Sequence, residues 1–450
     1  MEMSIISGPQ AEGSNASSSG PSSFLEQPNQ NTMNHSSRSN EKRALSPDPE
    51  TQLNSAATSI RDGKEEHDVE NGHTHIDIND PNRPRYGLKQ RLHHFTWAWY
   101  TFPMSTGGLS LLIFAQPHQF PGLRQIGLFV YIVNIIIFTV ITALMLTRFL
   151  LHRGDLTKSL SHPREGFFFP TFFLSIATLI TSTQRYAIPD NDIALTWAIK
   201  TVYWGYVAVT LILAVGQYSF VFASHSFGLQ TMMPTWILPI FPVMLSGTIA
   251  SVIASTQPDI DAVPIVVGGM TCQGLGISVS FMMYAHMVGR LMQAGLPNRE
   301  HRPGLFMCVG PPSFTALAFI GMADGLPSNF DPNGDGIIDG EIIRMFATIS
   351  AVFLWALALW WFFIAVVAVI SSPPKYFHLG WWAMVFPNTG FILATISIGN
   401  QLQNDIVLYF ANGFSIILLS TYLFVFYHLI RAVWIQDIMY PGRDEDVEDH

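Results

Sequence analysis

The sequence predicts an all-α membrane protein with ten transmembrane helices. Of the 450 residues, 49% are hydrophobic and only 12% are charged, which is about half the charged fraction of an ordinary soluble protein. Apolar segments long enough to cross a bilayer, for which about 20 residues are needed, follow one another from residue 95 onward. Alternate segments also contain a proline at a nearly constant spacing.

The predicted spans alternate between segments with and without an internal proline. The odd-numbered spans contain one, whereas the sixth only begins with Pro264, at a first-turn position where proline is tolerated because no donor is needed there. The limits of the spans are 95–117, 125–150, 166–186, 194–222, 234–255, 262–290, 303–323, 342–371, 378–399 and 406–434.

The proline step indicates a repeated unit of about 70 residues. Proline removes a backbone donor and clashes with the carbonyl four residues before it, so a buried helix should avoid it. A phenylalanine precedes four of the five prolines. The five are 67, 72, 70 and 75 residues apart, at Pro103, Pro170, Pro242, Pro312 and Pro387.

The two ends of the chain differ in composition from its centre. The first is rich in Ser, Asn, Pro and acidic residues, so it buries too little apolar surface to fold, and it lacks the apolar core of a signal peptide. We predict a disordered cytoplasmic tail over residues 1–88, the ten-helix domain over 89–436 and an acidic cytoplasmic tail over 437–450.

Lys and Arg are unevenly distributed between the two sets of span ends. Fourteen flank the ends that are cytoplasmic if the amino terminus is inside, and three flank the opposite ends. Because Lys and Arg in short loops stay in the cytoplasm, both termini are predicted to be cytoplasmic. All five proline spans then run outward, with each proline roughly 6 to 14 Å into the membrane.

Irregular backbone at such depth is tolerated only where protein or water satisfies it. The economical arrangement is an inner ring of the five proline helices around a pore, with the other five helices outside and facing lipid. A proline also opens the amino end of the half-helix that follows it, where N–H groups and the helix dipole favour negative charge. Broken helices that aim these ends at an anionic substrate are a known transporter device.

The predicted substrate path follows these openings. For any single span the alternative stays open that Ser, Thr and Gly only permit close helix packing. The residues of the path are Pro103, Ser105, Thr106, Gly107, Pro170, Thr171, Pro242, Ser246, Pro312, Ser313, Thr315, Pro387, Asn388 and Thr389.

Lys200 joins this path as an intramembrane charge, a functional candidate by default, with snorkelling to the interface as an equal alternative. Gln217, Gln273, His286 and Asp324 are further polar candidates. The phenylalanine of each Phe–Pro step is either a pore constriction or ordinary packing.

Several kinds of chemistry are not supported. There is no nucleophile–base pair, phosphate-binding loop or HExxH motif, so the sequence does not predict an enzyme. Residues 331–341 imitate a calcium loop, but Ile342 stands where the bidentate Glu is needed, so we predict a plain acidic turn. Cys272 and Cys308 lie in apolar runs, and the net charge of −9 argues against nucleic acid. No metal or cofactor is predicted.

From residue 92 to about residue 446 the sequence resembles the fungal malate permeases, the malic acid transport proteins of the tellurite-resistance and dicarboxylate transporter family. The segments that carry the resemblance are HFTWAWYTFPMSTGG (94–108), PTWILPIFP (234–242), STQP (255–258), QGLG (273–276), RPGLFMCVGPPSFTALA (302–318), FPNTGF (386–391) and YPGRDED (440–446).

The resemblance implies five helical hairpins in quasi-fivefold array around a central pore, a fold shared with plant guard-cell slow anion channels. It implies a plasma-membrane transporter of C4-dicarboxylates such as malate, succinate and fumarate, a gate at Phe386 and a homotrimer. Proton coupling stays open, and Lys200 departs from the arginine that the family leads us to expect. The alternatives are a sulfite exporter or anion channel of the same fold and, from another class, a receptor or scaffold.

Overall fold

The computed structural model describes residues 84–189, 192–327, 329–331, 334 and 339–441. Within these residues the regular structure is entirely helical, and nine helices are long and apolar enough to cross a membrane. The all-α membrane class predicted from the sequence is therefore confirmed. Residues 1–83 of the predicted amino-terminal tail, residues 442–450 of the carboxyl-terminal tail and most of the calcium-like loop lie outside the described residues.

Five helices form an inner ring. They are α2 (Thr101–Phe114), α5 (Pro170–Tyr186), α7 (Phe241–Ile253), α9 (Gly310–Asp324) and α11 (Phe386–Gln401). Each helix contacts the next one in this order, and α11 contacts α2, which closes the ring. The inner ring predicted from the proline spacing is therefore present.

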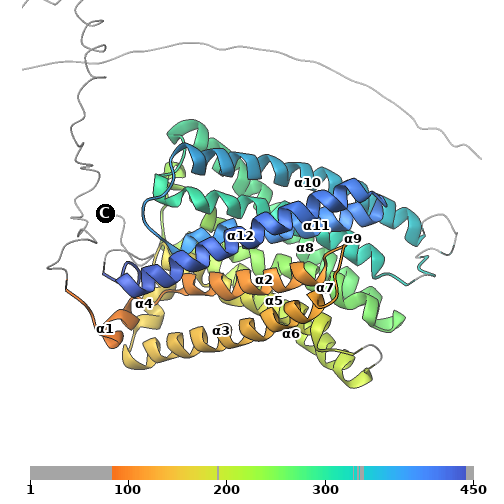
Figure 1. Cartoon of the computed structure of the whole chain (residues 1–450), viewed down its shortest axis with the longest axis horizontal. Helices are drawn as coiled ribbons and strands as arrows, with labels where there is room; N and C mark the ends of the chain where they lie inside the picture. The colour runs from red at the N-terminus through yellow and green to blue at the C-terminus, as the bar shows by residue number, and fades with distance from the viewer. Residues whose placement is uncertain (1–83, 190–191, 328, 332–333, 335–338, 442–450) are drawn as a thin grey trace, which may run out of the picture. The chain divides into compact units, whose positions relative to one another are not determined.

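Each inner helix forms a hairpin with the longer helix that follows it in the chain. These outer helices are α3 (Leu123–Leu151), α6 (Ile193–Ser224), α8 (Asp259–Ala294), α10 (Gly340–Ser371) and α12 (Asp405–Ile435). In their most apolar stretches only 11% to 44% of the residues are buried, against 67% to 100% in the spans that contain α5, α7, α9 and α11. The outer helices run roughly alongside the inner ones, and α3 and α10 lie on opposite edges of the bundle (Figure 1).

The proline steps mark a change of helix type. Each inner helix starts at or just before its proline and follows a 3-10 segment, because proline fits the first turn of an α-helix but cannot lie in its interior without losing a hydrogen bond. The 3-10 segments are η2 (Trp97–Tyr100), η3 (Glu165–Phe168), η5 (Pro234–Ile240), η7 (Arg299–Val309) and η8 (Leu379–Met384).

The first predicted span differs from the others. Its α-helix α2 has 14 residues and is not among the nine membrane-length helices of the described chain, although it is a member of the inner ring. Its 14 residues are fewer than the about 20 that are needed to cross the hydrocarbon of a bilayer. The all-helical ring is established, whereas the total of ten crossings stays a prediction.

The first and last described segments of the chain lie together. The backbone N–H of Tyr86 donates to Gln436 Oε1 at 3.1 Å, and Gln436 Nε2 donates back to the Tyr86 carbonyl at 3.1 Å. Arg91 Nη2 donates to the carbonyl of Val433 at 2.9 Å. The Tyr86 and Tyr440 rings lie with their centroids 5.1 Å apart. Both segments are therefore at the same end of the bundle.

Candidate anion path

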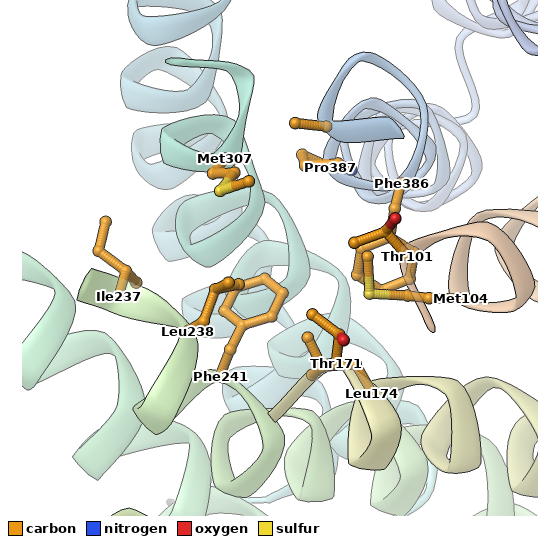
Figure 2. Close-up of a pocket in the computed structure, with 11 residues that line it drawn as sticks. Thr101, Met104, Thr171, Leu174, Ile237, Leu238, Phe241, Met307, Phe386 and Pro387 are labelled. Atoms are coloured by element: carbon orange, nitrogen blue, oxygen red, sulfur yellow. The ribbon is translucent and has the colours of Figure 1, made fainter. Parts of the chain in front are cut away.

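A cavity of about 20 Å³ lies where the inner helices begin. It holds about one water molecule, since roughly 10 to 15 Å³ is needed for one. Figure 2 shows its side chains converging from separate ribbons around a common centre. The lining residues are Thr101, Met104, Thr171, Leu174, Ile237, Leu238, Phe241, Met307, Ala383, Phe386 and Pro387. We call it the first cavity.

A second cavity, also of about 20 Å³, lies about one or two turns further along the same helices. It is lined by Gly108, Leu111, Ala177, Thr178, Thr181, Leu245, Thr248, Ile249, Phe314, Phe386, Thr389 and Leu393. All five inner helices contribute, and the hydroxyls of four threonines supply its polar atoms. Phe386 is the one residue that lines both cavities, so its ring separates them.

Three phenylalanine rings meet at this division. The ring of Phe386, which is 2% exposed, stacks on Phe314 with centroids 4.9 Å apart and planes at 26°. Phe241 meets Phe314 edge-on at 5.9 Å and Phe386 at 6.3 Å. A closed, apolar barrier between two water-sized cavities is the arrangement that stops ions by excluding water.

Glycines make room for this phenylalanine cluster, which comprises Phe241, Phe314 and Phe386. A Cβ at Gly390 would lie 2.7 Å from the Phe314 ring, and one at Gly310 would lie 2.7 Å from the Phe241 ring. A Cβ at Gly108 would approach the Phe386 ring at 3.3 Å. Real Cβ atoms avoid contacts below about 3 Å because of steric overlap, so the Phe314 and Phe241 rings depend on Gly390 and Gly310, whereas the space at Gly108 is only tight.

The other two Phe–Pro steps have a packing role. Phe102 stacks on Trp382 at 4.9 Å and on Phe426 of α12 at 5.6 Å. Phe169 contacts Trp97 edge-on at 4.8 Å. Neither lines a central cavity, so the repeated dipeptide serves the barrier at Phe241 and Phe386 and helix packing at Phe102 and Phe169.

Among the predicted path residues, Thr171, Pro387, Thr389 and Phe386 line the central cavities. Others contact neighbouring helices, where they satisfy backbone or side-chain groups. The Thr106 hydroxyl lies 3.0 Å from that of Tyr422 in α12, and Ser105 donates to the Trp382 carbonyl at 3.5 Å. Thr315 accepts from Gln273 Nε2 at 2.7 Å.

The remaining predicted residues of the path are buried within the inner helices. Ser313 donates to the carbonyl of Val309 at 2.7 Å, and Asn388 donates to that of Met384 at 2.8 Å. The others in this group are Pro103, Gly107, Pro170, Pro242, Ser246 and Pro312.

Lys200 lies in a different place. Its Nζ pairs with Asp261 Oδ2 at 2.7 Å, and both side chains are partly exposed, at 23% and 31%. The pair borders a larger cavity of about 640 Å³, which shares none of its lining residues with the two central cavities. This larger cavity lies between α6 and α8, and Gln184 and Gln257 also line it.

Side chains of the outer helices donate to carbonyls that lie four residues before the prolines. Pro312 cannot bond the Cys308 carbonyl four residues before it, and Tyr284 of α8 donates its hydroxyl there at 2.8 Å. Gln217 of α6 donates at 2.7 Å to the Gly166 carbonyl behind Pro170, which also accepts from the backbone N–H of Phe169 at 3.2 Å. These pairs keep the broken backbone satisfied inside the bundle. The sequence singled out Gln217 as polar but offered no sign of the Tyr284 contact.

Several other lining residues were not predicted from the sequence, although a helical pattern marks them. Positions 101, 104, 108 and 111 lie on one face of α2, and 171, 174, 178 and 181 lie on one face of α5. Aligning the repeats on their prolines and following this face would have found Thr178 and Thr181.

Electrostatically, the first cavity favours negative charge. Thr101, Thr171, Phe241 and Phe386 each lie in the first turn of an inner helix, and they all border it. The first turns of four inner α-helices therefore converge there, and the amino end of an α-helix favours negative charge. No Lys or Arg is among the described residues that line either central cavity.

Comparison with known proteins places this geometry in context. Residues 94–430 match the family SLAC1, described as voltage-dependent anion channel. The chain is 38% identical over 367 residues to a malic acid transport protein of Schizosaccharomyces pombe, covering 81% of this chain and 84% of that protein. A putative malic acid transport protein of the same organism is 33% identical, covering 81% and 86%. A sulfite efflux pump of Arthroderma benhamiae is 25% identical, covering 74% and 89%.

Proposed function

The chain belongs to the SLAC1 family of voltage-dependent anion channels, and from this membership we propose that it carries C4-dicarboxylates such as malate across the plasma membrane. The observation that supports the proposal is the convergence of helix amino ends on the first cavity, next to the Phe386 barrier. The two relatives named as malic acid transport proteins support the choice of substrate class.

Transport requires the phenylalanine cluster to open. Two cavities of about 20 Å³ are too small for a dicarboxylate, so the structure is that of a closed path. When the Phe386 ring swings away, the two cavities join. A carboxylate at the helix amino ends then meets the threonine hydroxyls of the second cavity. Many weak donors let an anion pass without trapping it.

We further propose ten crossings, with α2 completing the nine membrane-length helices, and both termini in the cytoplasm. The contacts between Tyr86 and Gln436 support an even number of crossings, because they hold both ends of the domain at the same end of the bundle. The distribution of Lys and Arg supports the cytoplasmic assignment. A homotrimer belongs to the same proposal, with exposed apolar faces of the outer helices as contact surfaces.

Flux measurements test the substrate class. Purified protein in proteoliposomes should take up radiolabelled malate above protein-free vesicles, and unlabelled succinate and fumarate should compete. Imposing a pH gradient shows whether protons are coupled, since a coupled carrier accumulates malate against its concentration gradient. Malate uptake equal to that of protein-free vesicles, with sulfite entering the same preparation, would overturn the dicarboxylate proposal.

Sulfite transport is the second candidate. The relative named as a sulfite efflux pump covers 74% of this chain. Competition between sulfite and malate in the same vesicles ranks the two candidates directly.

A further inference from the structure

Three metal-ligating side chains meet at the end of the bundle where α1 (Leu88–His93) and α4 (Asp155–Ser161) adjoin α3. Figure 1 shows α1 and α4 beside one end of α3. His93 is the last residue of α1, His152 caps the end of α3, and Asp155 begins α4. None of the three residues lines either central cavity.

The three groups are close enough to share one ion. Each offers one ligand atom, and these atoms all lie within 4.8 Å of one another. His93 Nδ1 is 2.8 Å from Asp155 Oδ2, and the centroids of the two imidazole rings are 4.8 Å apart. Ligand atoms around a tetrahedral zinc ion are about 3.3 Å apart, at bonds of about 2.0 to 2.1 Å. Small side-chain movements therefore suffice.

A second observation points to a missing ligand. Nε2 of His152 is buried and has no hydrogen-bond partner within the described part of the chain. A buried polar atom without a partner is costly, and an ordinary His93–Asp155 hydrogen bond leaves that cost in place. A metal ion bound by all three side chains would remove it.

The surrounding charges suit a dication. Arg148 lies near Asp155, with its Nε 3.8 Å from Oδ2, but its Nη1 is paired with Glu165 Oε1 at 2.7 Å. Ser159 also donates to Glu165 at 2.7 Å, which holds that carboxylate in place. Arg148 and Glu165 offset each other, so Asp155 leaves a net negative charge beside two neutral imidazoles.

We propose that His93, His152 and Asp155 form a binding site for a transition-metal dication of the zinc type. Two imidazoles and one carboxylate are a ligand set that such ions accept, and a solvent molecule completes the coordination at the exposed His93 side. Metal ligands bind in their deprotonated forms, so the ion competes with protons and its affinity falls as the pH is lowered. The ion joins α1 to the α3–α4 corner. Since α1 leads directly into η2 and α2, the bound ion also holds the start of the inner ring in place.

Zinc titration of the full-length protein tests the site. Protein purified without a histidine tag, in detergent or proteoliposomes, should bind one Zn²⁺ per chain by calorimetry. His152→Ala and Asp155→Asn should each raise the Kd by at least about tenfold. His286→Gln is the matched control, because it removes an exposed histidine of α8 outside the group and should leave the Kd unchanged. Hydrogen exchange should slow in residues 88–93 when zinc is added.

Because Asp155 also lies near Arg148, its variant is interpreted only if its elution and thermal unfolding match the wild type. His152→Ala has no such partner among the described residues and supplies the independent result. Absence of stoichiometric binding in the wild type, or equal affinity in folded His152→Ala, overturns the proposal. Since the readout is binding, the result is independent of which anion is transported.

Discussion

The Phe386 ring lies against the Phe314 ring, with centroids 4.9 Å apart and planes at 26°, between two cavities of the inner ring. The two phenylalanines come from α11 and α9, so movement of either helix changes the barrier. Only Phe386 belongs to a Phe–Pro step, whereas Phe314 follows Pro312 by two residues.

Replacing the ring at the barrier should open the path. Phe386→Ala removes the side chain shared by both cavities, so anion flux in proteoliposomes should rise several-fold. Phe102→Ala is the matched control, because Phe102 is also followed by proline but stacks on Trp382 outside the central cavities. Unchanged flux in a well-folded Phe386→Ala protein would remove Phe386 from the barrier.

A methyl group at Gly390 should disturb the same barrier through Phe314. The added Cβ would lie 2.7 Å from the Phe314 ring, so Gly390→Ala should lower stability by about 1 to 3 kcal/mol. Thermal unfolding in detergent measures this. Combining Gly390→Ala with Phe314→Leu should recover part of the lost stability, because leucine is smaller than phenylalanine and leaves space for the added methyl group. Gly413→Ala, where a Cβ meets nothing within 4 Å, should be neutral or slightly stabilising; equal losses at both glycines would contradict the steric account.

The Tyr284 hydroxyl should matter because it serves a carbonyl that Pro312 cannot. Tyr284→Phe leaves the Cys308 carbonyl without its 2.8 Å donor and should cost about 1 to 3 kcal/mol in unfolding free energy. Tyr203→Phe removes a similar hydrogen bond, 3.2 Å long, to Ile265 inside the continuous helix α8. That carbonyl also lies within reach of the helical N–H four residues on, so the control should lose less. Equal losses of unfolding free energy in the two variants would show that the proline break does not increase the contribution of the Tyr284 hydrogen bond.

The two ion pairs should differ in their contribution. Arg148 and Glu165 are 6% and 2% exposed, so Glu165→Gln strands a buried charge and should cost about 3 to 5 kcal/mol. Lys200 and Asp261 are 23% and 31% exposed, so Asp261→Asn should cost no more than about 1 kcal/mol. Unfolding curves of the two variants compare them, and a larger loss at Asp261 would refute the ranking by burial.

Much of the architecture could be predicted because it depends on local chemistry. The proline at each step cannot lie inside an α-helix, so the change from 3-10 to α at Pro170 or Pro387 follows from the residue itself. The length of the apolar runs and the closed order of inner helices followed from the same repeat. The count of ten was harder, because α2 has the proline step but only 14 residues and is not among the nine membrane-length helices of the described chain.

The candidate site could be predicted only in part. Phe386, Pro387, Thr171 and Thr389 line the central cavities, whereas Ser105 and Thr106 face neighbouring segments. Residues near a proline were expected to share one environment. A side chain two residues along a helix points about 200° away, so proximity in sequence does not bring two residues to the same face.

By itself, then, the sequence determined the membrane class, the repeat and the positions of the helix breaks, because apolar length and proline chemistry act within each segment. Only the tertiary structure decided that Phe241 and Phe386 point to the centre while Phe102 and Phe169 pack elsewhere. The rotation of a helix about its axis is set by the neighbours it packs against, and those contacts join residues far apart in the chain. For the same reason, neither the Tyr284 contact nor the group of His93, His152 and Asp155 could be predicted from the sequence.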